Sequence, residues 1–370
     1  MREATALAEA GFTVSIVDVE RERSLPDEET ISGIHVKHII RPDWFTSPRF
    51  TPWILIRTLQ KIIVSTRQLL RTPAAVYHAH DLTALPACYI AAQLHRASLI
   101  FDAHELPLHE LNGSLWYRFR KLFASILTLL ISRCASVITV SPPIAREIRT
   151  RYHPPAVSLV RNIPAYQTVP QSDRLRQRLK LGKGARIVLY QGNIQPNRSL
   201  EMLVHAAPFL EPDTVIVLMG WASDVDREQL AALIERKGVG ERVKILPPVP
   251  YKDLLHWTAS ADIGLVIFSP DYSLNIRWCL PNKLFEYLMA GLPVLASPLD
   301  AVADVLNAYA VGQVVSSLAP ADIATAINSM LADRVVLERM HQNAQQAVQR
   351  DLCWEKERQN LLELYQNLIR

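Results

Sequence analysis

The chain has 370 residues, of which 49% are hydrophobic and 21% are charged. This composition excludes an intrinsically disordered chain, and the length exceeds what one hydrophobic core usually organises. A net charge of +4 is too small to indicate a nucleic-acid-binding protein, so we expect no nucleic-acid partner. The four cysteines have no paired spacing, which favours a reducing compartment over a disulfide framework: Cys88, Cys134, Cys279 and Cys353.

The ends of the chain and its apolar runs predict a cytoplasmic protein. Met1 is followed at once by a helical pattern rather than by a signal peptide. The longest apolar run, residues 122–131, is about half of the ~20 residues that a membrane-spanning helix needs. We therefore expect a soluble chain, or one that is peripheral on the inner face of the membrane.

Helix and strand patterns alternate through the first half of the chain. Gly11 is well placed to end the first helix, and Pro142 stands in the first turn of the last one. Helices are expected at 1–10, 51–71, 81–94, 114–133 and 142–151. Strands are expected at 12–18, 33–40, 75–78, 98–101 and 136–140.

The second half repeats this alternation after a proline-rich linker near residues 164–175. Strands are expected at 187–191, 215–219, 243–246, 263–267, 294–296 and 311–314. Helices are expected at 199–209, 226–237, 251–259, 283–290, 301–308 and 320–348. The pattern predicts an α/β chain with two Rossmann-like, doubly wound parallel-sheet domains, 1–165 and 166–350, that face each other across an interdomain cleft.

One element of the first domain is missing from this pattern. A doubly wound domain opens with a central strand and a loop, whereas this chain opens on the helix 1–10. Without that strand, buried backbone groups would remain unpaired, and each costs ~1–3 kcal/mol. We therefore expect either further residues before Met1 or another segment in the place of the first strand.

The strongest candidate for an anion site is the segment 280–294. Asn282 can cap a short helix that Gly291 ends, which leaves backbone amides at the start of the helix for a phosphate group. Lys283 adds a positive charge in the first turn, and Glu286 could bind both hydroxyls of a ribose. The alternative is an ordinary capped surface helix.

A second anion-binding element is the segment 191–200, which follows a buried strand and opens a helix. Arg198 lies where a guanidinium could bind a diphosphate through two hydrogen bonds. The alternative is a solvated charge in a strand–helix loop.

Histidines and acidic residues follow two strands of the first domain. His104 comes just after a strand, where it could bind or polarise a sugar or phosphate, and Asp102 or Glu105 could orient it. Alternation places His78 and His80 on one side of the preceding strand, but no further ligand cluster is evident, so we expect no metal site. The alternative for His104 is a structural histidine.

The acidic pair Asp224 and Asp226 belongs to the second domain. We interpret these two residues as capping the helix that starts there.

A basic and aromatic surface is expected on the first domain, where residues 44–163 carry 14 Lys and Arg against 5 Asp and Glu. The segments 49–71 and 114–131 interleave these cations with apolar residues, as on surfaces that bind anionic lipid. The residues concerned are Arg49, Arg57, Lys61, Arg67, Arg71, Trp116, Tyr117, Arg118, Phe119, Arg120 and Lys121. The alternative is domain packing with a solvated rim.

These motifs together resemble those of the retaining glycosyltransferases of family 4. Gly192 and Arg198 precede the segment Pro281-Asn282-Lys283-Leu284-Phe285-Glu286-Tyr287, and Ala290-Gly291-Leu292-Pro293-Val294 follows it. The segments Ala79-His80-Asp81 and Asp102-Ala103-His104-Glu105 are similar to the acceptor-side half of that family. Asn193 and Ser199 stand where many members have a basic residue and a glycine.

The resemblance implies the two-domain GT-B fold, with a final helix in 351–370 that returns to the first domain. It implies a nucleoside-diphosphate sugar as donor substrate, with no cofactor and no metal. The residues that it implies for donor binding are Gly192, Arg198, Asn282, Lys283, Leu284 and Glu286. It implies His104 and Glu105 as catalytic residues and His80 and Asp81 on the acceptor side.

The function implied is the transfer of a sugar, with retention of its anomeric configuration, to a glycan or lipid-linked acceptor in surface polysaccharide biosynthesis. Two alternatives remain open: a nucleotide-sugar 2-epimerase on the same fold, and a non-catalytic paralogue that binds a sugar nucleotide.

Overall fold

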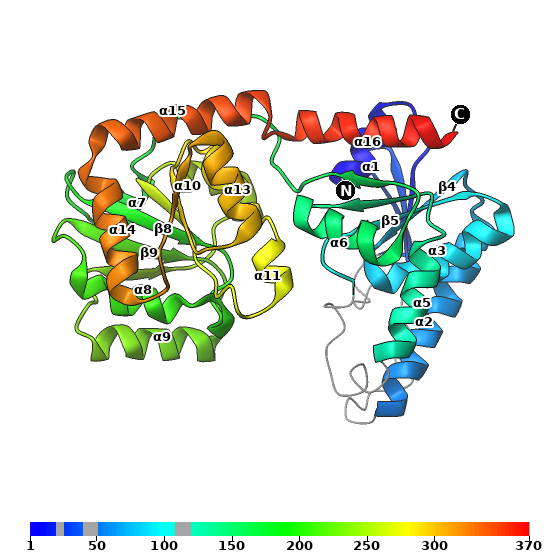
Figure 1. Cartoon of the computed structure of the whole chain (residues 1–370), viewed down its shortest axis with the longest axis horizontal. Helices are drawn as coiled ribbons and strands as arrows, with labels where there is room; N and C mark the ends of the chain where they lie inside the picture. The colour runs from blue at the N-terminus through cyan, green and yellow to red at the C-terminus, as the bar shows by residue number, and fades with distance from the viewer. Residues whose placement is uncertain (20–25, 40–50, 108–119, 370) are drawn as a thin grey trace. The chain divides into compact units, whose positions relative to one another are not determined.

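The structure is a computed structural model that describes residues 1–19, 26–39, 51–107 and 120–369, without the side chains of 51–57 and 120. It divides into two compact units (Figure 1). Unit 1 contains residues 1–161 and 357–370, and unit 2 contains residues 162–356. The sequence places these boundaries at 165/166 and 350/351, whereas the structure has them at 161/162 and 356/357. No described helix is both long enough and apolar enough to cross a membrane.

Unit 1 alternates strands and helices much as the sequence indicates. Ser141 caps α6 through its hydroxyl, and Gly11, with a φ of +91°, follows the end of α1. The elements are α1 (Arg2–Glu9), β1 (Ser15–Asp18), β2 (Glu28–Ile31), β3 (Ile34–His38), α2 (Thr51–Arg71), β4 (Val76–His80), α3 (Asp81–His95), β5 (Ser98–Ala103), α5 (Arg120–Ile131), β6 (Ser136–Thr139), α6 (Pro142–Tyr152), β7 (Val157–Leu159) and, for the most part, α16 (Trp354–Ile369). Residues 114–119 of the helix expected at 114–133 lie outside the described residues.

The strands of unit 1 form two sheets rather than one. The orders are β1-β3-β2 and β4-β5-β6-β7, and every pairing is parallel except that of β2 with β3. Among the described residues, β1 pairs only with β3 and β4 only with β5. The hydrogen-bonded ladder is thus interrupted between β1 and β4, which is where the order 3-2-1-4-5-6 of a doubly wound sheet has its first strand.

Unit 2 has a complete doubly wound sheet. The order is β10-β9-β8-β11-β12-β13, and every pairing is parallel. Its elements are α7 (Arg174–Leu179), β8 (Arg186–Gln191), η1 (Pro196–Arg198), α8 (Leu200–Ala206), η2 (Ala207–Phe209), β9 (Thr214–Met219), α9 (Asp224–Arg236), β10 (Val243–Leu246), η3 (Tyr251–Asp253), α10 (Leu254–Thr258), β11 (Ile263–Val266), α11 (Leu274–Trp278), α12 (Asn282–Met289), β12 (Val294–Ala296), α13 (Asp300–Tyr309), β13 (Gly312–Val314), α14 (Pro320–Ala332) and α15 (Arg334–Arg350).

Helices cover both faces of the unit 2 sheet (Figure 1). Alternation along β8 sends Ile187 and Leu189 into the core under α12, α13 and α15. Val188 and Tyr190 point into the second core, under α8, α9 and α14. Burial on both sides explains the continuous apolar runs of these strands.

Several sequence-based expectations for unit 2 were wrong in detail. The helix expected at 320–348 is two helices, because Asp333 interrupts it and caps α15 by accepting a hydrogen bond from the Val336 amide at 3.0 Å. Asn282 is the first residue of α12 rather than its cap, and Pro281 precedes it. Ser223, not Asp224, caps α9. The short elements α7 and α11 of unit 2 and β2 and β7 of unit 1 were not expected, since their residues show little periodicity.

Helix α16 is held on unit 1 by a buried ion pair. Both guanidinium contacts of Arg161 with Glu357 Oε1 are short, at 2.9 and 2.6 Å, and the Arg161 amide donates to Oε2 at 2.7 Å. Glu357 is only 1% exposed, so its charge depends on these donors. A second pair, Arg358 with Glu9 at 2.7 Å, links α16 to α1.

Replacing Glu357 by Gln should destabilise the chain. The substitution leaves the Arg161 guanidinium without its carboxylate, and breaking such a buried pair costs roughly 3 kcal/mol. Urea unfolding followed by circular dichroism measures this cost. The control is Glu363→Gln at an exposed position of the same helix. Equal unfolding midpoints for the two variants would show that the pair does not hold α16.

Candidate functional site

The residues that the sequence predicts to bind the donor lie in unit 2, where β8 meets α12. They are Gly192, Arg198, Asn282, Lys283, Leu284 and Glu286, and are called the donor-side cluster. Tyr287 Oη accepts a hydrogen bond from the Gln191 amide at 2.8 Å and donates to the Leu189 carbonyl at 3.1 Å. A Cβ on Gly264 would lie 2.4 Å from the Tyr287 ring, so β11 needs a glycine there. These contacts fix α12, which carries Lys283 and Glu286, against the end of β8.

The loop after β8 turns sharply at Gly192. This residue has a φ of +124°, and a Cβ there would lie 3.1 Å from Lys283 Nζ. A Cβ on Gly220 would lie 1.8 Å from the Gly192 carbonyl oxygen, so the two loops approach through two glycines. The turn leads into η1, which ends at Arg198.

Lys283 and Arg198 lie on the same aromatic ring. Lys283 Nζ is 3.6 Å from the centre of the Tyr190 ring and 5.1 Å from that of Phe268, and the Arg198 guanidinium carbon is 5.0 Å from the latter. Such contacts are favourable for each cation. With its amide oxygen turned toward Arg198, Gln195 accepts hydrogen bonds from Nε and an Nη at 3.1 Å.

The pair of cations has no carboxylate within ion-pairing distance among the described residues. Burial and the neighbouring Arg198 both lower the pKa of Lys283 well below its usual value. An anion bound between the two side chains would relieve this repulsion. The geometry therefore suits a diphosphate, as the sequence predicts for these two residues.

Glu286 is held by a chain of side-chain hydrogen bonds. Gln191 Nε2 donates to Glu286 Oε2 at 2.6 Å, and Gln191 Oε1 accepts from the Thr258 hydroxyl at 2.7 Å. All three side chains are buried. Gln191 and Thr258 were missed by sequence reasoning, because an amide and a hydroxyl give no motif of their own.

The remaining donor-side residues expected from the sequence lie on the same helix, with different exposures. Asn282 is exposed at the start of α12, while Leu284 is fully buried and its amide bonds to the Pro281 carbonyl at 2.9 Å. Leu284 therefore packs the helix against the core rather than presenting a side chain to solvent.

A second cluster lies in unit 1, where β4 and β5 end side by side. The parallel register sets His80 against Asp102, and His104 follows β5. Asp102 Oδ2 is 2.9 Å from His80 Nδ1 and 3.2 Å from His104 Nε2. Of the two carboxylates that the sequence offers to orient His104, Asp102 lies within reach of its ring, whereas Glu105 has an exposed side chain.

Two more residues complete the unit 1 cluster. His78 Nε2 is 3.8 Å from Asp102 Oδ2 and 3.9 Å from Glu3 Oε2, and the rings of His78 and His80 stack at 4.4 Å. Asp81 is exposed at the start of α3 with a φ of +62°, a conformation that Asp tolerates better than most residues.

Charge and burial shift the titration of the unit 1 cluster. Interaction with Asp102 raises the pKa of His104 to about 9, whereas burial lowers that of His78 to about 3. Burial raises the pKa of Glu3 to about 7. Burial acts to raise the pKa of Asp102 as well, but His104 and His80 outweigh it and hold this pKa below its usual value.

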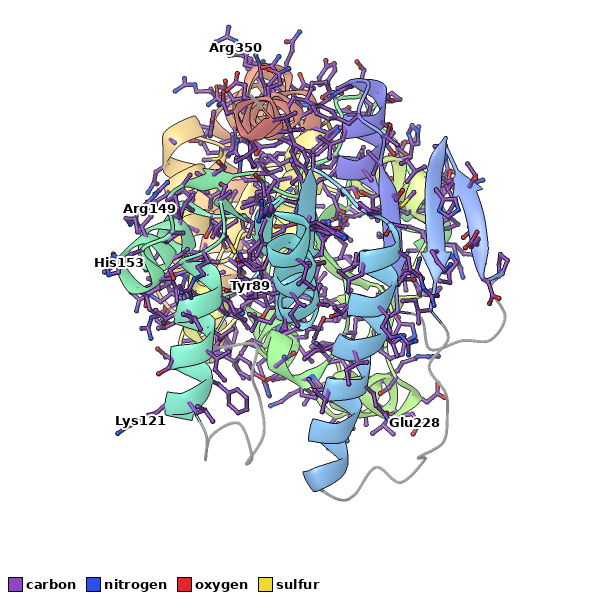
Figure 2. All side chains as sticks on the ribbon, turned by 90° about the vertical axis from the view of Figure 1, so that its right-hand side faces the viewer. Tyr89, Lys121, Arg149, His153, Glu228 and Arg350 are labelled. Carbon is purple, nitrogen blue, oxygen red and sulfur yellow. The ribbon has the colours of Figure 1, made fainter. Side chains whose placement is uncertain are left out.

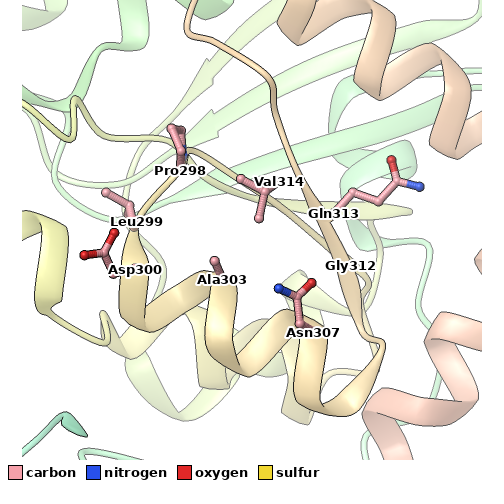
Figure 3. Close-up of a pocket in the computed structure, with 8 residues that line it drawn as sticks. All are labelled: Pro298, Leu299, Asp300, Ala303, Asn307, Gly312, Gln313 and Val314. Atoms are coloured by element: carbon pink, nitrogen blue, oxygen red, sulfur yellow. The ribbon is translucent and has the colours of Figure 1, made fainter. Parts of the chain in front are cut away.

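An open pocket of about 580 Å³ lies elsewhere in unit 2, between α13 and β13 (Figure 3). It is lined by Pro298, Leu299, Asp300, Ala303, Asn307, Gly312, Gln313 and Val314, none of which belongs to the donor-side cluster. Asp300 already accepts hydrogen bonds from Arg277 and Trp278.

Each half of the chain matches the model of a known glycosyltransferase family. Residues 1–163 match the model of Glycosyltransferase Family 4, and residues 171–347 match that of Glycosyl transferases group 1. The chain belongs to the GT4-type glycosyltransferases. The family resemblance predicted from the motifs is thereby confirmed. The facing arrangement of the units and the cleft between them stay predictions.

The curated relatives match only part of this chain, at modest sequence identity. A D-inositol 3-phosphate glycosyltransferase of Nocardia farcinica is 32% identical over 222 residues, which are 57% of this chain and 46% of the relative. The chain thus spans about half the length of the curated relatives it matches.

Two solved structures share the fold. Sucrose-phosphate synthase of Thermosynechococcus elongatus has a TM-score of 0.82 at 18% identity, over 100% of this chain and 92% of that one. Anabaena HepE in complex with UDP and glucose has a TM-score of 0.69 at 18% identity, over 91% of this chain and 87% of that one. These similarities confirm the expected GT-B fold class.

Replacing Asp102 by Asn should lower the pKa of His104 from about 9 toward its ordinary value of about 6.5, because the carboxylate favours the protonated ring. NMR titration of the imidazole signals in the presence of EDTA measures the shift. In the parent chain, the stability that this interaction contributes is fully present below pH 6.5 and is lost as the pH rises through about 9.

The control is Asp271→Asn, an exposed position of unit 2, which should leave the His104 titration unchanged. A His104 pKa that stays near 9 in Asp102→Asn would show that Asp102 is not its partner.

Proposed function

We propose that this chain transfers a sugar from a nucleoside-diphosphate sugar to an acceptor hydroxyl, with retention of the anomeric configuration. The observation that carries the proposal is the placement of Lys283 Nζ and the Arg198 guanidinium on one Phe268 ring without a described carboxylate partner. Family membership over both halves of the chain supports the same conclusion.

The donor-side residues have distinct tasks in this reaction. Lys283 and Arg198 neutralise the diphosphate as the bond to the sugar breaks, which lowers the barrier by stabilising the leaving group. The α12 N-terminus, with Asn282, adds the positive end of a helix dipole. Glu286, oriented by Gln191, accepts hydrogen bonds from the ribose hydroxyls. Gly192 allows the backbone and Lys283 to approach the diphosphate closely.

The histidine cluster of unit 1 acts on the sugar and acceptor side. His104 is protonated at neutral pH, so it donates a hydrogen bond to an oxygen of the sugar or of the acceptor. Asp102 positions its ring. His80 and Asp81, which are exposed at the end of β4 and the start of α3, contact the acceptor, and Glu105 follows His104 in the chain.

Removing either cation should weaken donor binding. Lys283→Met and Arg198→Ala each remove a charged hydrogen-bond donor, which is worth about 1.5–3 kcal/mol, or roughly tenfold or more in Kd. Calorimetry with a UDP-sugar is the measurement, because a fold neighbour was solved with UDP and glucose. GDP- and ADP-sugars form parallel arms.

The matched control is Arg227→Ala, which removes an exposed arginine of α9 that pairs with Asp224. Unchanged affinity in both site variants for every donor that the parent chain binds would refute the donor site. Product analysis separates the possible activities. Turnover of donor only with an acceptor indicates transfer, turnover to an epimer with donor alone indicates a 2-epimerase, and binding without turnover indicates a non-catalytic paralogue.

We further propose a lipid-linked or glycan acceptor of surface polysaccharide biosynthesis, reached at the inner face of the membrane. The support is an exposed apolar surface on α2, α3 and α5. Leu94 is 64% exposed, and its exposed neighbours on these helices are Leu59, Ile63, Val64, Ile90, Leu122, Ile126 and Leu129. Arg67 and Arg71 of α2 and Lys121 of α5 are exposed on the same helices, and Figure 2 shows Lys121 at the start of α5.

Only part of the segments 49–71 and 114–131 contributes to this argument. Arg67, Arg71 and Lys121 are exposed, whereas Arg49, Trp116, Tyr117, Arg118 and Phe119 lie outside the described residues, as do the side chains of Arg57 and Arg120. A surface of apolar residues flanked by cations fits an anionic membrane.

A polyol phosphate is the second acceptor class to test, because relatives of this chain are named D-inositol 3-phosphate glycosyltransferases.

Charging the apolar surface should abolish vesicle binding. In Ile126→Glu with Leu129→Glu, two exposed side chains of α5 are replaced by anions that anionic lipid repels, so we expect the bound fraction to fall about tenfold. Co-sedimentation with phosphatidylglycerol–phosphatidylcholine vesicles at low salt measures it. Val225→Glu, an exposed apolar residue of unit 2, is the control. Failure of the parent chain to bind these vesicles would remove the membrane proposal.

A further inference from the structure

Four potential metal ligands converge in unit 1. One ligand atom from each of Glu3, His78, His80 and Asp102 lies within 4.8 Å of all the others. The residues come from three elements, α1, β4 and β5. Sequence reasoning saw only the two histidines as a pair and expected no metal site, because Glu3 and Asp102 are distant in the chain.

The fold itself produces this convergence. Residues two apart on a strand point to the same face, which stacks His78 and His80 of β4. Parallel pairing then sets Asp102 of β5 opposite His80. Glu3, in the first turn of α1, supplies the fourth group at 3.9 Å from His78 Nε2.

Two of the atoms that face one another lack hydrogen bonds. Glu3 Oε2 and His78 Nε2 are shielded from solvent and have no hydrogen-bond partner in the described part of the chain. Asp102, only 1% exposed, turns Oδ2 into the same space, where it lies 2.9 Å from His80 Nδ1. Buried polar atoms without partners are costly, so a bound cation would explain the arrangement.

Tyr365 orients one of the rings. Its hydroxyl is 2.8 Å from His78 Nδ1. When Nδ1 carries the ring proton and donates it to this hydroxyl, the lone pair of Nε2 is directed at the other three groups. Metal-bound histidines almost always use their second nitrogen in such a contact, which fixes the tautomer and the ring orientation.

We propose that Glu3, His78, His80 and Asp102 form a binding site for one divalent transition-metal ion, with Zn²⁺ the best match. Two imidazole nitrogens and two carboxylate oxygens make a four-coordinate set that Zn²⁺ accepts, whereas Mg²⁺ and Ca²⁺ prefer oxygen alone. Two carboxylates balance the charge of the ion.

The distances suit a tetrahedral site. Metal–ligand bonds of ~2.0–2.2 Å place neighbouring ligand atoms about 3.3 Å apart. The three measured separations of 2.9, 3.8 and 3.9 Å bracket this value, so small side-chain rotations close the site. The ion would tie α1 to the sheet of unit 1. The proposed donor site lies in the other unit, so loss of Zn²⁺ binding and loss of donor binding are separate outcomes.

Metal binding to the EDTA-treated chain tests the site. We expect calorimetry with Zn²⁺ to give one ion per chain, and Co²⁺ to give the visible absorption of a tetrahedral complex without a thiolate charge-transfer band. Glu3→Gln removes one ligand charge and leaves the side-chain shape, so it should weaken binding tenfold or more. His205→Gln, a histidine of unit 2, is the control and should bind as the parent does.

A milder variant tests the orienting contact. Tyr365→Phe keeps the ring and removes only the hydroxyl on His78 Nδ1, so it should weaken Zn²⁺ binding about 10–100-fold at unchanged stoichiometry. Three results would each overturn the proposal: no Zn²⁺ binding by the parent chain, equal affinity in Glu3→Gln and the parent, or a cobalt spectrum dominated by thiolate ligation at the four cysteines.

Discussion

The hydroxyl of Tyr287 is the contact on which the cluster of Lys283, Glu286, Gly192 and Arg198 depends. It receives the last amide of β8, donates to a carbonyl of the same strand, and lies over a glycine of β11 where no larger residue fits. Because Tyr287 is on α12, this one group fixes the helix with Lys283 and Glu286 against the loop with Gly192 and Arg198. Residues about 90 positions apart in the chain thereby form one cluster.

The clusters of the two units carry opposite charges. The cluster of unit 2 gathers two cations on one aromatic ring without a described carboxylate in ion-pairing range, and burial disfavours the charge of Lys283. The cluster of unit 1 gathers two carboxylates and several histidines, with buried atoms that lack hydrogen bonds. An anion would complete the first cluster and a cation the second. In each case the charge of the ligand is inferred from side chains that lack a partner of opposite charge or a hydrogen bond, and not from the size of a cavity.

Much of the fold could be predicted because apolar runs and glycine or proline boundaries alternate regularly. The parallel sheet of unit 2 and the placement of Lys283 and Glu286 on one helix follow from local spacing. Other features depend on contacts between distant residues. Gln191 has its role only because it meets Glu286, and Glu3 becomes a ligand only because α1 lies beside β4. The break at Asp333 was missed because both flanking segments are strongly helical, so periodicity alone predicts one helix.

The interrupted ladder of unit 1 has a consequence for the behaviour of the chain in solution. Among the described residues, β1 and β4 each present one side without a strand partner, and a row of unpaired amides and carbonyls is a template for strand addition. Such an edge accepts any extended segment of suitable register, including one from a second copy. We therefore expect self-association of this chain to proceed by β-augmentation and to rise steeply with protein concentration.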